Sequence, residues 1–100
     1  MSPGDARRVR LVPPVGWDST DGTVLAPRPP TLDGMTIGLL ANGKANGDRI
    51  LDMVVHHLQH RHRITAVVRA TKAHPSLPMS DDVLAMFAEH AHAVLTAIGD

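Results

Sequence analysis

The residues best suited to chemistry in this 100-residue chain stand in one short loop, Ala41–Asp48 (ANGKANGD). Its Asn42, Gly43, Lys44 and Asn46 combine two amide side chains, an ammonium group and a pliable backbone. If a helix begins after the loop, its first backbone N–H groups add further donors. These hydrogen-bond donors could bind an anionic or carbonyl group of a ligand, so we treat these residues as candidate ligand contacts. The loop matches neither the P-loop nor the GxGxxG spacing, and a structural alternative stays open in which the glycines make tight turns and Asn46 caps the helix.

Two further polar stretches follow apolar runs later in the chain. Lys72 stands in a polar loop after the second run, and Gly99 and Asp100 follow the third. An aspartate in such a position is usually just solvated. These residues become a candidate site only if the fold brings them to the loop that holds Asn42.

The seven histidines raise the alternative of a metal site. His56 and His60 are spaced i, i+4, and two histidines so spaced on a helix can chelate zinc. At 100° per residue, however, they point away from the apolar stripe of that helix, and no acidic residue completes an HExxH pattern. We therefore predict no metal site and interpret both histidines as part of a polar outer face.

Composition narrows the classes of function. Ten Lys and Arg residues balance ten Asp and Glu residues, which does not favour a nucleic-acid partner. The chain has no cysteine, so it predicts no disulfide and no thiolate among these residues. The apolar stretch after Arg10 is broken at Pro13 and Pro14, too early for a signal peptide, and no run approaches the ~20 apolar residues of a membrane span. We expect a soluble cytoplasmic protein with no membrane partner.

The chain changes character near residue 35. Residues 1–35 hold most of the eight prolines and predict an extended Pro/Gly-rich arm. Residues 36–100 are regular and predict an α/β domain, which we interpret as the N-terminal half of a larger one. We expect the arm to lie across this domain or across a partner subunit, because its apolar residues would otherwise be in water. These are Leu11, Val12, Val15, Trp17, Val24 and Leu25.

Five elements are predicted in residues 36–100. Continuous apolar runs predict strands, and apolar residues at helical spacing predict helices. The strands are expected at Thr36–Leu40, Ile64–Val68 and Ala93–Ile98, the helices over Arg49–Arg61 and after Ser80, and a polar loop over Arg69–Pro78. Ser80 is the expected N-cap of the second helix, with Asp81 and Asp82 in its first turn.

The order β-α-β-α-β indicates parallel strands joined by helical crossovers. All three strands are apolar throughout, as expected when helices cover both faces of a sheet. Right-handed crossovers with one helix on each face give the strand order 2-1-3. We therefore predict an α/β, flavodoxin-like three-layer fold with an incomplete sheet whose third strand is an open edge. Ligands bind where the strand order reverses, here between the first and third strands, so the loop after the first strand should meet Gly99 and Asp100.

Three segments resemble the UGSC family of (seleno)proteins: Thr31–Asn46 (TLDGMTIGLLANGKAN), Val68–Lys72 and above all Ala97–Asp100 (AIGD). The resemblance extends over most of residues 20–100. It implies a fold similar to the aspartate/glutamate racemase-like and glycine-reductase-like α/β proteins, and a redox role for a selenol or thiol. In that family an Ile-Gly-Asp-like turn ends the third strand, and selenocysteine or cysteine follows at once, then Gly-Ser-Cys.

The resemblance implies that the nucleophile would directly follow Asp100. Because a stop codon encodes selenocysteine, we interpret the chain as a truncated fragment of a selenol- or thiol-dependent redox enzyme for a small-molecule substrate, inactive as given and without other cofactors. Asp100 would adjoin the nucleophile, Lys44 and Lys72 would stabilise negative charge, and a ligand would contact Asn42, Gly43, Asn46 and Gly99. The alternative is a small non-catalytic α/β binding or dimerisation domain, a homo-oligomer that pairs through its third strand.

Overall fold

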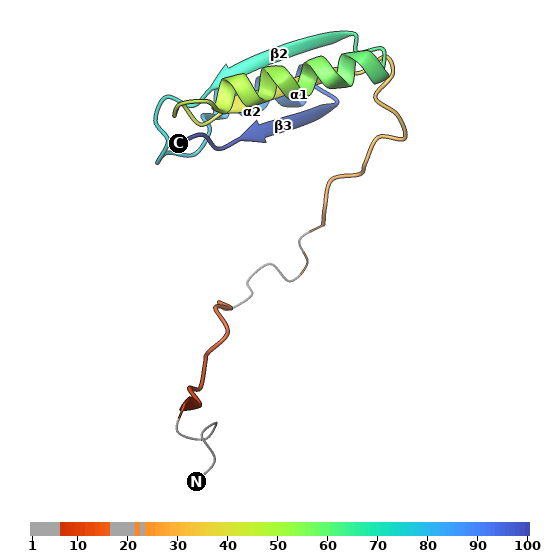
Figure 1. Ribbon diagram of the computed structural model, residues 1–100. Coiled ribbons are helices and arrows are strands. Elements are labelled where there is room, and N and C mark those ends of the chain that lie inside the picture. Colours follow the sequence, from red (N-terminus) through yellow and green to blue (C-terminus); the bar gives the residue numbers. More distant parts are fainter. Residues whose placement is uncertain (1–6, 17–21, 23) are drawn as a thin grey trace.

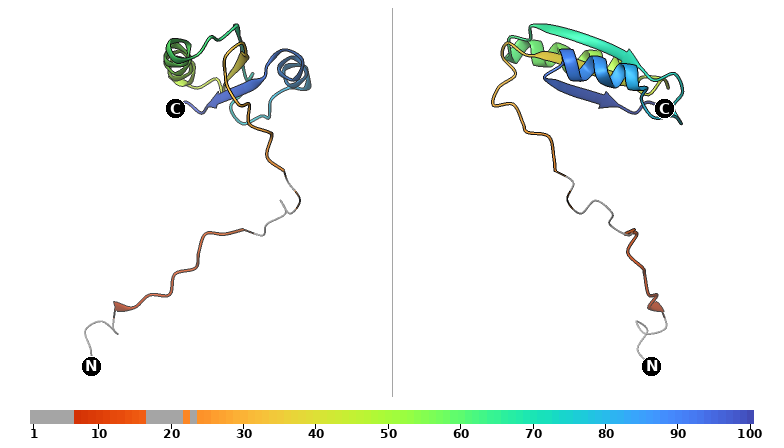
Figure 2. Two further views of the ribbon diagram at one scale, coloured as in Figure 1. Left: turned by 90° about the vertical axis from the view of Figure 1, so that its right-hand side faces the viewer. Right: turned by 180° about the vertical axis from the view of Figure 1, so that it is seen from behind.

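The computed structural model describes residues 7–16, 22 and 24–100 (Figure 1). The elements are β1 (Thr36–Ala41), α1 (Gly47–Arg61), β2 (Ala66–Thr71), α2 (Asp81–His90) and β3 (Ala93–Ala97). The three strands are parallel and stand in the order β2-β1-β3. The left view of Figure 2 shows α1 and α2 on opposite sides of the sheet. The predicted open, three-layer α/β arrangement with strand order 2-1-3 is confirmed.

The core lies between β1 and α1. Residues of a strand point alternately to its two faces, and on one face Ile37 and Leu39 are each 1% exposed. They pack with Leu51 and Val55, one turn apart on α1.

On the opposite face of β1, the helix α2 packs against the sheet through the aromatic ring of Phe87. Gly38 leaves room there for Phe87, which is 3% exposed. A Cβ atom at residue 38 would lie only 2.8 Å from the Phe87 ring and 3.1 Å from Val94. The missing side chain of Gly38 therefore sets how closely α2 approaches the sheet.

The position of β2 corrects the sequence prediction. The apolar pattern predicts a strand over Ile64–Val68 followed by a loop, whereas β2 starts two residues later and continues through Arg69 to Thr71. Its residues pair one to one with β1, from Thr36↔Ala66 to Ala41↔Thr71, so pairing rather than hydrophobicity sets its bounds. Arg69 is compatible with the strand because its exposed side chain forms an ion pair with Asp52 of α1.

The expectation that every strand is covered on both faces holds for β1 only. The residues of β2 and β3 largely alternate between half-buried and exposed. Two helices, one on each face, cover the central strand but leave the outer strands partly open. On β3 the side chain of Val94 is 45% exposed. This strand stands at one end of the sheet and pairs only with β1 among the described residues, so it is an open edge, as the strand order predicts.

The two helices begin in different ways. Ser80 caps α2 as predicted, accepting a hydrogen bond from the backbone N–H of Val83 at 3.4 Å. Asn46 occupies the N-cap position of α1 but has a left-handed conformation, with φ 70° and ψ −10°, and its side chain makes no capping hydrogen bond. Asn46 is thus the N-cap residue of α1, as the structural alternative predicts, but it does not cap the helix through its side chain. Asparagine is one of the few residue types that adopt this conformation at modest cost.

The last residues of the arm, Asp33 and Gly34, are hydrogen-bonded to the domain. The Asp33 carboxylate accepts a hydrogen bond from the backbone N–H of Arg63 at 2.8 Å, and the backbone N–H of Gly34 donates to the Arg63 carbonyl at 2.7 Å. Further back, the arm leads away from the domain (Figure 1). Leu32 packs against the core, but the large apolar side chains of the described residues from 9 to 25 are 77–87% exposed, so the structure does not show these packed on this chain's own domain. Trp17 lies outside the described residues.

Candidate functional site

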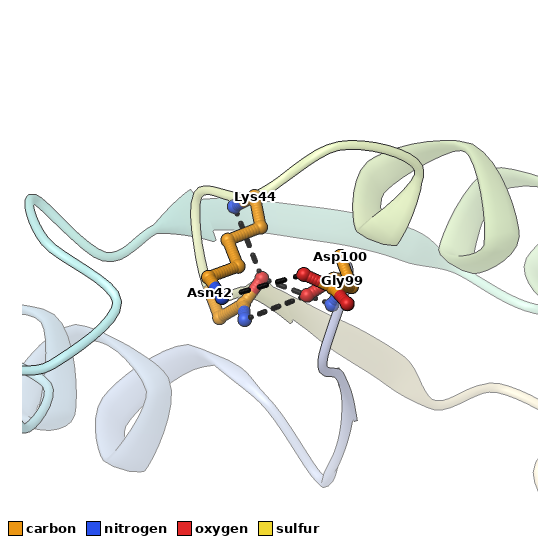
Figure 3. A network of polar contacts seen from close by, with 4 residues as sticks. All are labelled: Asn42, Lys44, Gly99 and Asp100. Atoms are coloured by element: carbon orange, nitrogen blue, oxygen red, sulfur yellow. Dashed lines mark hydrogen bonds and ion pairs between the residues drawn. The ribbon is translucent and has the colours of Figure 1, made fainter.

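The carboxyl ends of β1 and β3 meet beside the start of α1, where the strand order places the site (Figure 3). Pairing between these strands continues to Ala41↔Ala97, so the segments that follow them leave the sheet side by side. The structure thereby brings Asn42 and Lys44 together with Gly99 and Asp100.

The Asn42 side chain joins the two segments. It is 8% exposed, and its Oδ1 accepts hydrogen bonds from the backbone N–H groups of Gly99 at 3.0 Å and Lys44 at 3.1 Å. Its Nδ2 donates to the Gly99 carbonyl oxygen at 3.3 Å. Asn42 thus binds both polar backbone groups of Gly99, much as a neighbouring strand would, and closes its own loop with an Asx turn. The structure gives Asn42 a positioning role, and its contact with a ligand stays a prediction.

Glycines allow the backbones to approach this closely. A Cβ atom at residue 99 would collide with the Ala45 carbonyl oxygen and lie 2.8 Å from the Gly47 nitrogen. Gly43 has a φ of +93°, and a Cβ atom there would lie 3.1 Å from the Lys72 carbonyl oxygen. Gly47, in the second Asn-Gly pair of the predicted loop, is buried at this junction, and a Cβ atom there would lie 3.4 Å from the Gly99 nitrogen.

Lys44 and Asp100 supply the charges of the site. Their Nζ and Oδ1 atoms are 3.4 Å apart, and the side chains are 50% and 97% exposed. An ion pair this exposed contributes only about 0–1 kcal/mol to stability, so both groups can exchange partners at little cost. The pair places a cation beside the segment that follows β3.

Lys72 contributes to the site through its backbone. Its N–H donates to the Ala41 carbonyl oxygen at 2.9 Å, which continues the pairing of β1 and β2 by one residue. Its ammonium group instead donates to the Pro75 carbonyl oxygen at 3.0 Å, inside its own loop. The structure does not bring this ammonium group into contact with Lys44 or Asp100, and its catalytic role stays a prediction.

A polar hollow of about 230 Å³ adjoins the site, large enough for a group of a few atoms. Its lining residues are Ala41, Gly43, Lys44, Ala45, Asp48 and Thr71. Thr71 reaches this hollow because β2 extends past its predicted end.

The histidines of α1 form contacts with one another. The His60 Nδ1 donates to the His56 carbonyl oxygen at 2.8 Å, and the two rings meet edge to face with centroids 4.6 Å apart. Within residues 7–16, 22 and 24–100, no group of three or more His, Cys, Asp or Glu side chains is placed to hold a metal ion.

A family model matches most of the chain. It is the model of the UGSC family, and it covers residues 10–100, which include much of the arm and the whole α/β domain. Searches of curated proteins and of solved structures found no match. None of the helices in the described part of the chain is long and apolar enough to cross a bilayer.

Proposed function

The chain belongs to the UGSC family, and from this membership we propose that it is the N-terminal part of a selenol- or thiol-dependent redox protein. In this proposal a selenocysteine or cysteine directly follows Asp100, as the family resemblance implies. The 100 residues then build most of the nucleophile's surroundings and are inactive without it. A flavodoxin-like continuation of the sheet beyond β3 belongs to the same proposal.

The observation that carries the proposal is the attachment of Gly99 to Asn42. Because both polar backbone groups of Gly99 are bound to the Asn42 side chain, the chain leaves the sheet in a fixed direction. A residue after Asp100 would emerge near the first turn of α1, where backbone N–H groups favour negative charge. A thiolate or selenolate in such surroundings has a lowered pKa and is a good nucleophile.

Lys44 supports the same role. A carboxylate next to a thiol raises the pKa of that thiol, and Asp100 would be such a neighbour. The ion pair between Lys44 and Asp100 offsets this carboxylate. Lys44 can then also stabilise negative charge that develops on the substrate.

The proposed reaction transfers two electrons. The selenolate or thiolate attacks a small-molecule substrate R–X and forms a covalent bond to R, and X leaves with the electron pair of the broken R–X bond. The thiol of the family's Gly-Ser-Cys segment then attacks the selenium or sulfur atom, loses its proton and displaces R, which leaves with the bonding electron pair and takes up a proton to give R–H. The protein is left with a selenenylsulfide or disulfide, which an external thiol reductant restores. We propose a cytoplasmic location, where thiols stay reduced.

The gene gives a direct test. The DNA after the Asp100 codon should read TGA, followed in frame by codons for Gly-Ser-Cys and by a recoding hairpin. A TAA or TAG codon with no downstream frame would contradict the selenocysteine form of the proposal.

A chemical test uses the chain extended by Cys-Gly-Ser-Ser, which then contains a single thiol because residues 1–100 have no cysteine. The rate of alkylation by iodoacetamide, measured against pH, gives the pKa of this thiol. We expect a value below the ordinary ~8.5, raised by Lys44→Met. Arg61→Met is the matched control, because Arg61 lies in the last turn of α1, at the other end of this helix from the site. A thiol pKa that Lys44→Met leaves unchanged would refute the electrostatic part of the proposal.

The open edge of β3 favours a second candidate, a non-catalytic domain that dimerises through this strand. The exposed Val94 side chain agrees with such a surface. A sharp, cooperatively unfolding dimer of the 100-residue protein, combined with an ordinary stop codon in the gene, would favour this candidate over the redox protein.

A further inference from the structure

An apolar groove runs between α2 and the exposed face of β3. Its volume is about 470 Å³. The apolar side chains that line it include Met79, Leu84, Phe87, Ala88, Ala91 and Val94. Leu84 is 55% exposed and Val94 is 45% exposed. Figure 2 (right) shows α2 and β3 side by side on this face of the domain. Exposed apolar side chains that gather in one hollow can mark an interaction site.

The described residues 7–16 of the arm also carry exposed apolar side chains, which could fill such a groove. Val9, Leu11, Val12 and Val15 are 77–84% exposed. In an extended chain alternate side chains share one side, so Val9 and Leu11 lie together. The segment 7–16 can therefore present a small apolar face to a groove.

The charges of the arm and of α2 are complementary. Residues 7–16 contain three arginines, at positions 7, 8 and 10, and no acidic residue. The helix α2 contains Asp81, Asp82 and Glu89 and no Lys or Arg. Asp81 lies three residues before Leu84 and so continues the stripe that faces the groove. An arm in the groove would bring its arginines near this helix.

The path of the arm favours the groove of a second copy. Residues 25–29 adjoin the start of β3, in a hollow that shares His92 and Val94 with the groove. From there the arm leads away from its own domain (Figure 1). Pro27 and Pro29 fix their φ angles, which favours an extended, polyproline-like course for these residues.

We propose that residues 7–16 of one copy bind in the groove between α2 and β3 of a second copy, and that the exchange is reciprocal. Val9 and Leu11 enter the groove, and the arginines face the acidic residues of α2. The result is a dimer with two-fold symmetry and two identical arm–groove contacts. This inference is independent of the redox proposal.

The first test measures dimerisation of the full 100-residue chain by sedimentation equilibrium. Leu11→Asp in the arm and Leu84→Lys in the groove should each weaken the dimer by about tenfold or more, since each places a charge against apolar surface. Met53→Lys is the matched control, because Met53 is similarly exposed, at 62%, but lies on α1 away from the groove. Circular dichroism of each variant checks that the domain still folds.

The second test mixes the two defective variants. Leu11→Asp keeps an intact groove and Leu84→Lys keeps an intact arm, so a mixed dimer regains one of the two contacts. Random pairing of equal amounts already gives twice as much mixed dimer as either homodimer, so native mass spectrometry should show mixed dimer in clear excess of that share. A charge exchange, Arg10→Glu together with Asp81→Lys, should restore part of the affinity that each single change removes.

Three outcomes would overturn the inference. A monomeric protein at tens of micromolar would exclude the dimer at any useful affinity. A dimer that Leu11→Asp does not weaken would point to pairing of β3 edges instead. Protection of the groove by the arm within a monomer, seen by hydrogen exchange, would place the arm on its own domain.

Discussion

Removal of the Asn42 side chain tests how the site is built. Asn42→Ala deletes three hydrogen bonds from a side chain that is 8% exposed. Each such bond contributes about 0.5–1.5 kcal/mol net, and the loop N–H of Lys44 can bind water instead. We therefore expect a loss of about 2–4 kcal/mol in the free energy of unfolding, a large share of the ~5–15 kcal/mol of a typical domain. Urea denaturation followed by circular dichroism measures this loss.

The same variant has a local effect that global unfolding does not report. Exchange of the Gly99 amide hydrogen, followed by NMR, should become about 30-fold faster or more, at 1.4 kcal/mol per factor of ten. Asn42→Asp is the matched control, because it keeps both acceptor contacts but loses the donor to the Gly99 carbonyl oxygen. It should lose about 1–2 kcal/mol. If Asn42→Ala leaves both the stability and the exchange of Gly99 unchanged, the side chain does not hold this segment.

Three further variants test other parts of the fold. Gly38→Ala should cost about 1–3 kcal/mol in a urea melt, because its Cβ atom would lie 2.8 Å from the Phe87 ring; recovery in the double variant with Phe87→Leu would identify the clash as the cause. The hydrogen bond from the backbone N–H of Arg63 lowers the pKa of Asp33 below its ordinary 3.8, so its stabilisation is present above the unfolded-state pKa and is lost as the pH falls through the folded-state pKa. Asp33→Asn should accordingly flatten the fall in melting temperature below about pH 4, and an unchanged pH profile would refute this assignment. Asn46→Gly should be neutral or stabilise by up to about 1 kcal/mol, because glycine adopts the left-handed conformation freely; a clear loss of stability would show that the Asn46 side chain has a partner.

The sequence predicted the topology because its signals were local and agreed with one another. Ser80 with two following aspartates marked the start of α2. Apolar runs that alternate with segments of helical periodicity indicated parallel strands joined by helices. Strand bounds were less predictable. Hydrophobicity alone predicts that the strand ends before Arg69, but the pairing of Arg69 with β1 and the ion pair with Asp52 keep it in the strand.

The location of the candidate site could be predicted from the sequence, but the hydrogen bonds within it could not. The strand order alone put the loop after β1 beside Gly99 and Asp100. The hydrogen bonds between Asn42 and Gly99 depend on side-chain geometry across 57 residues of sequence, which no local pattern encodes. The contact of Lys72 with Pro75 is local, between residues three apart, but the sequence does not decide which way a lysine in a loop points.

The separation of Asn42 and Gly99 along the chain also has a kinetic consequence. A helix such as α1 forms in microseconds or less from neighbouring residues, whereas contacts between distant segments require a long loop to close first. We therefore expect the junction of Asn42 with Gly99 to form late in folding, after α1 and the pairing of β1 with β2. A spectroscopic label near Gly99 would report arrival at the native state, while circular dichroism would record the earlier helix.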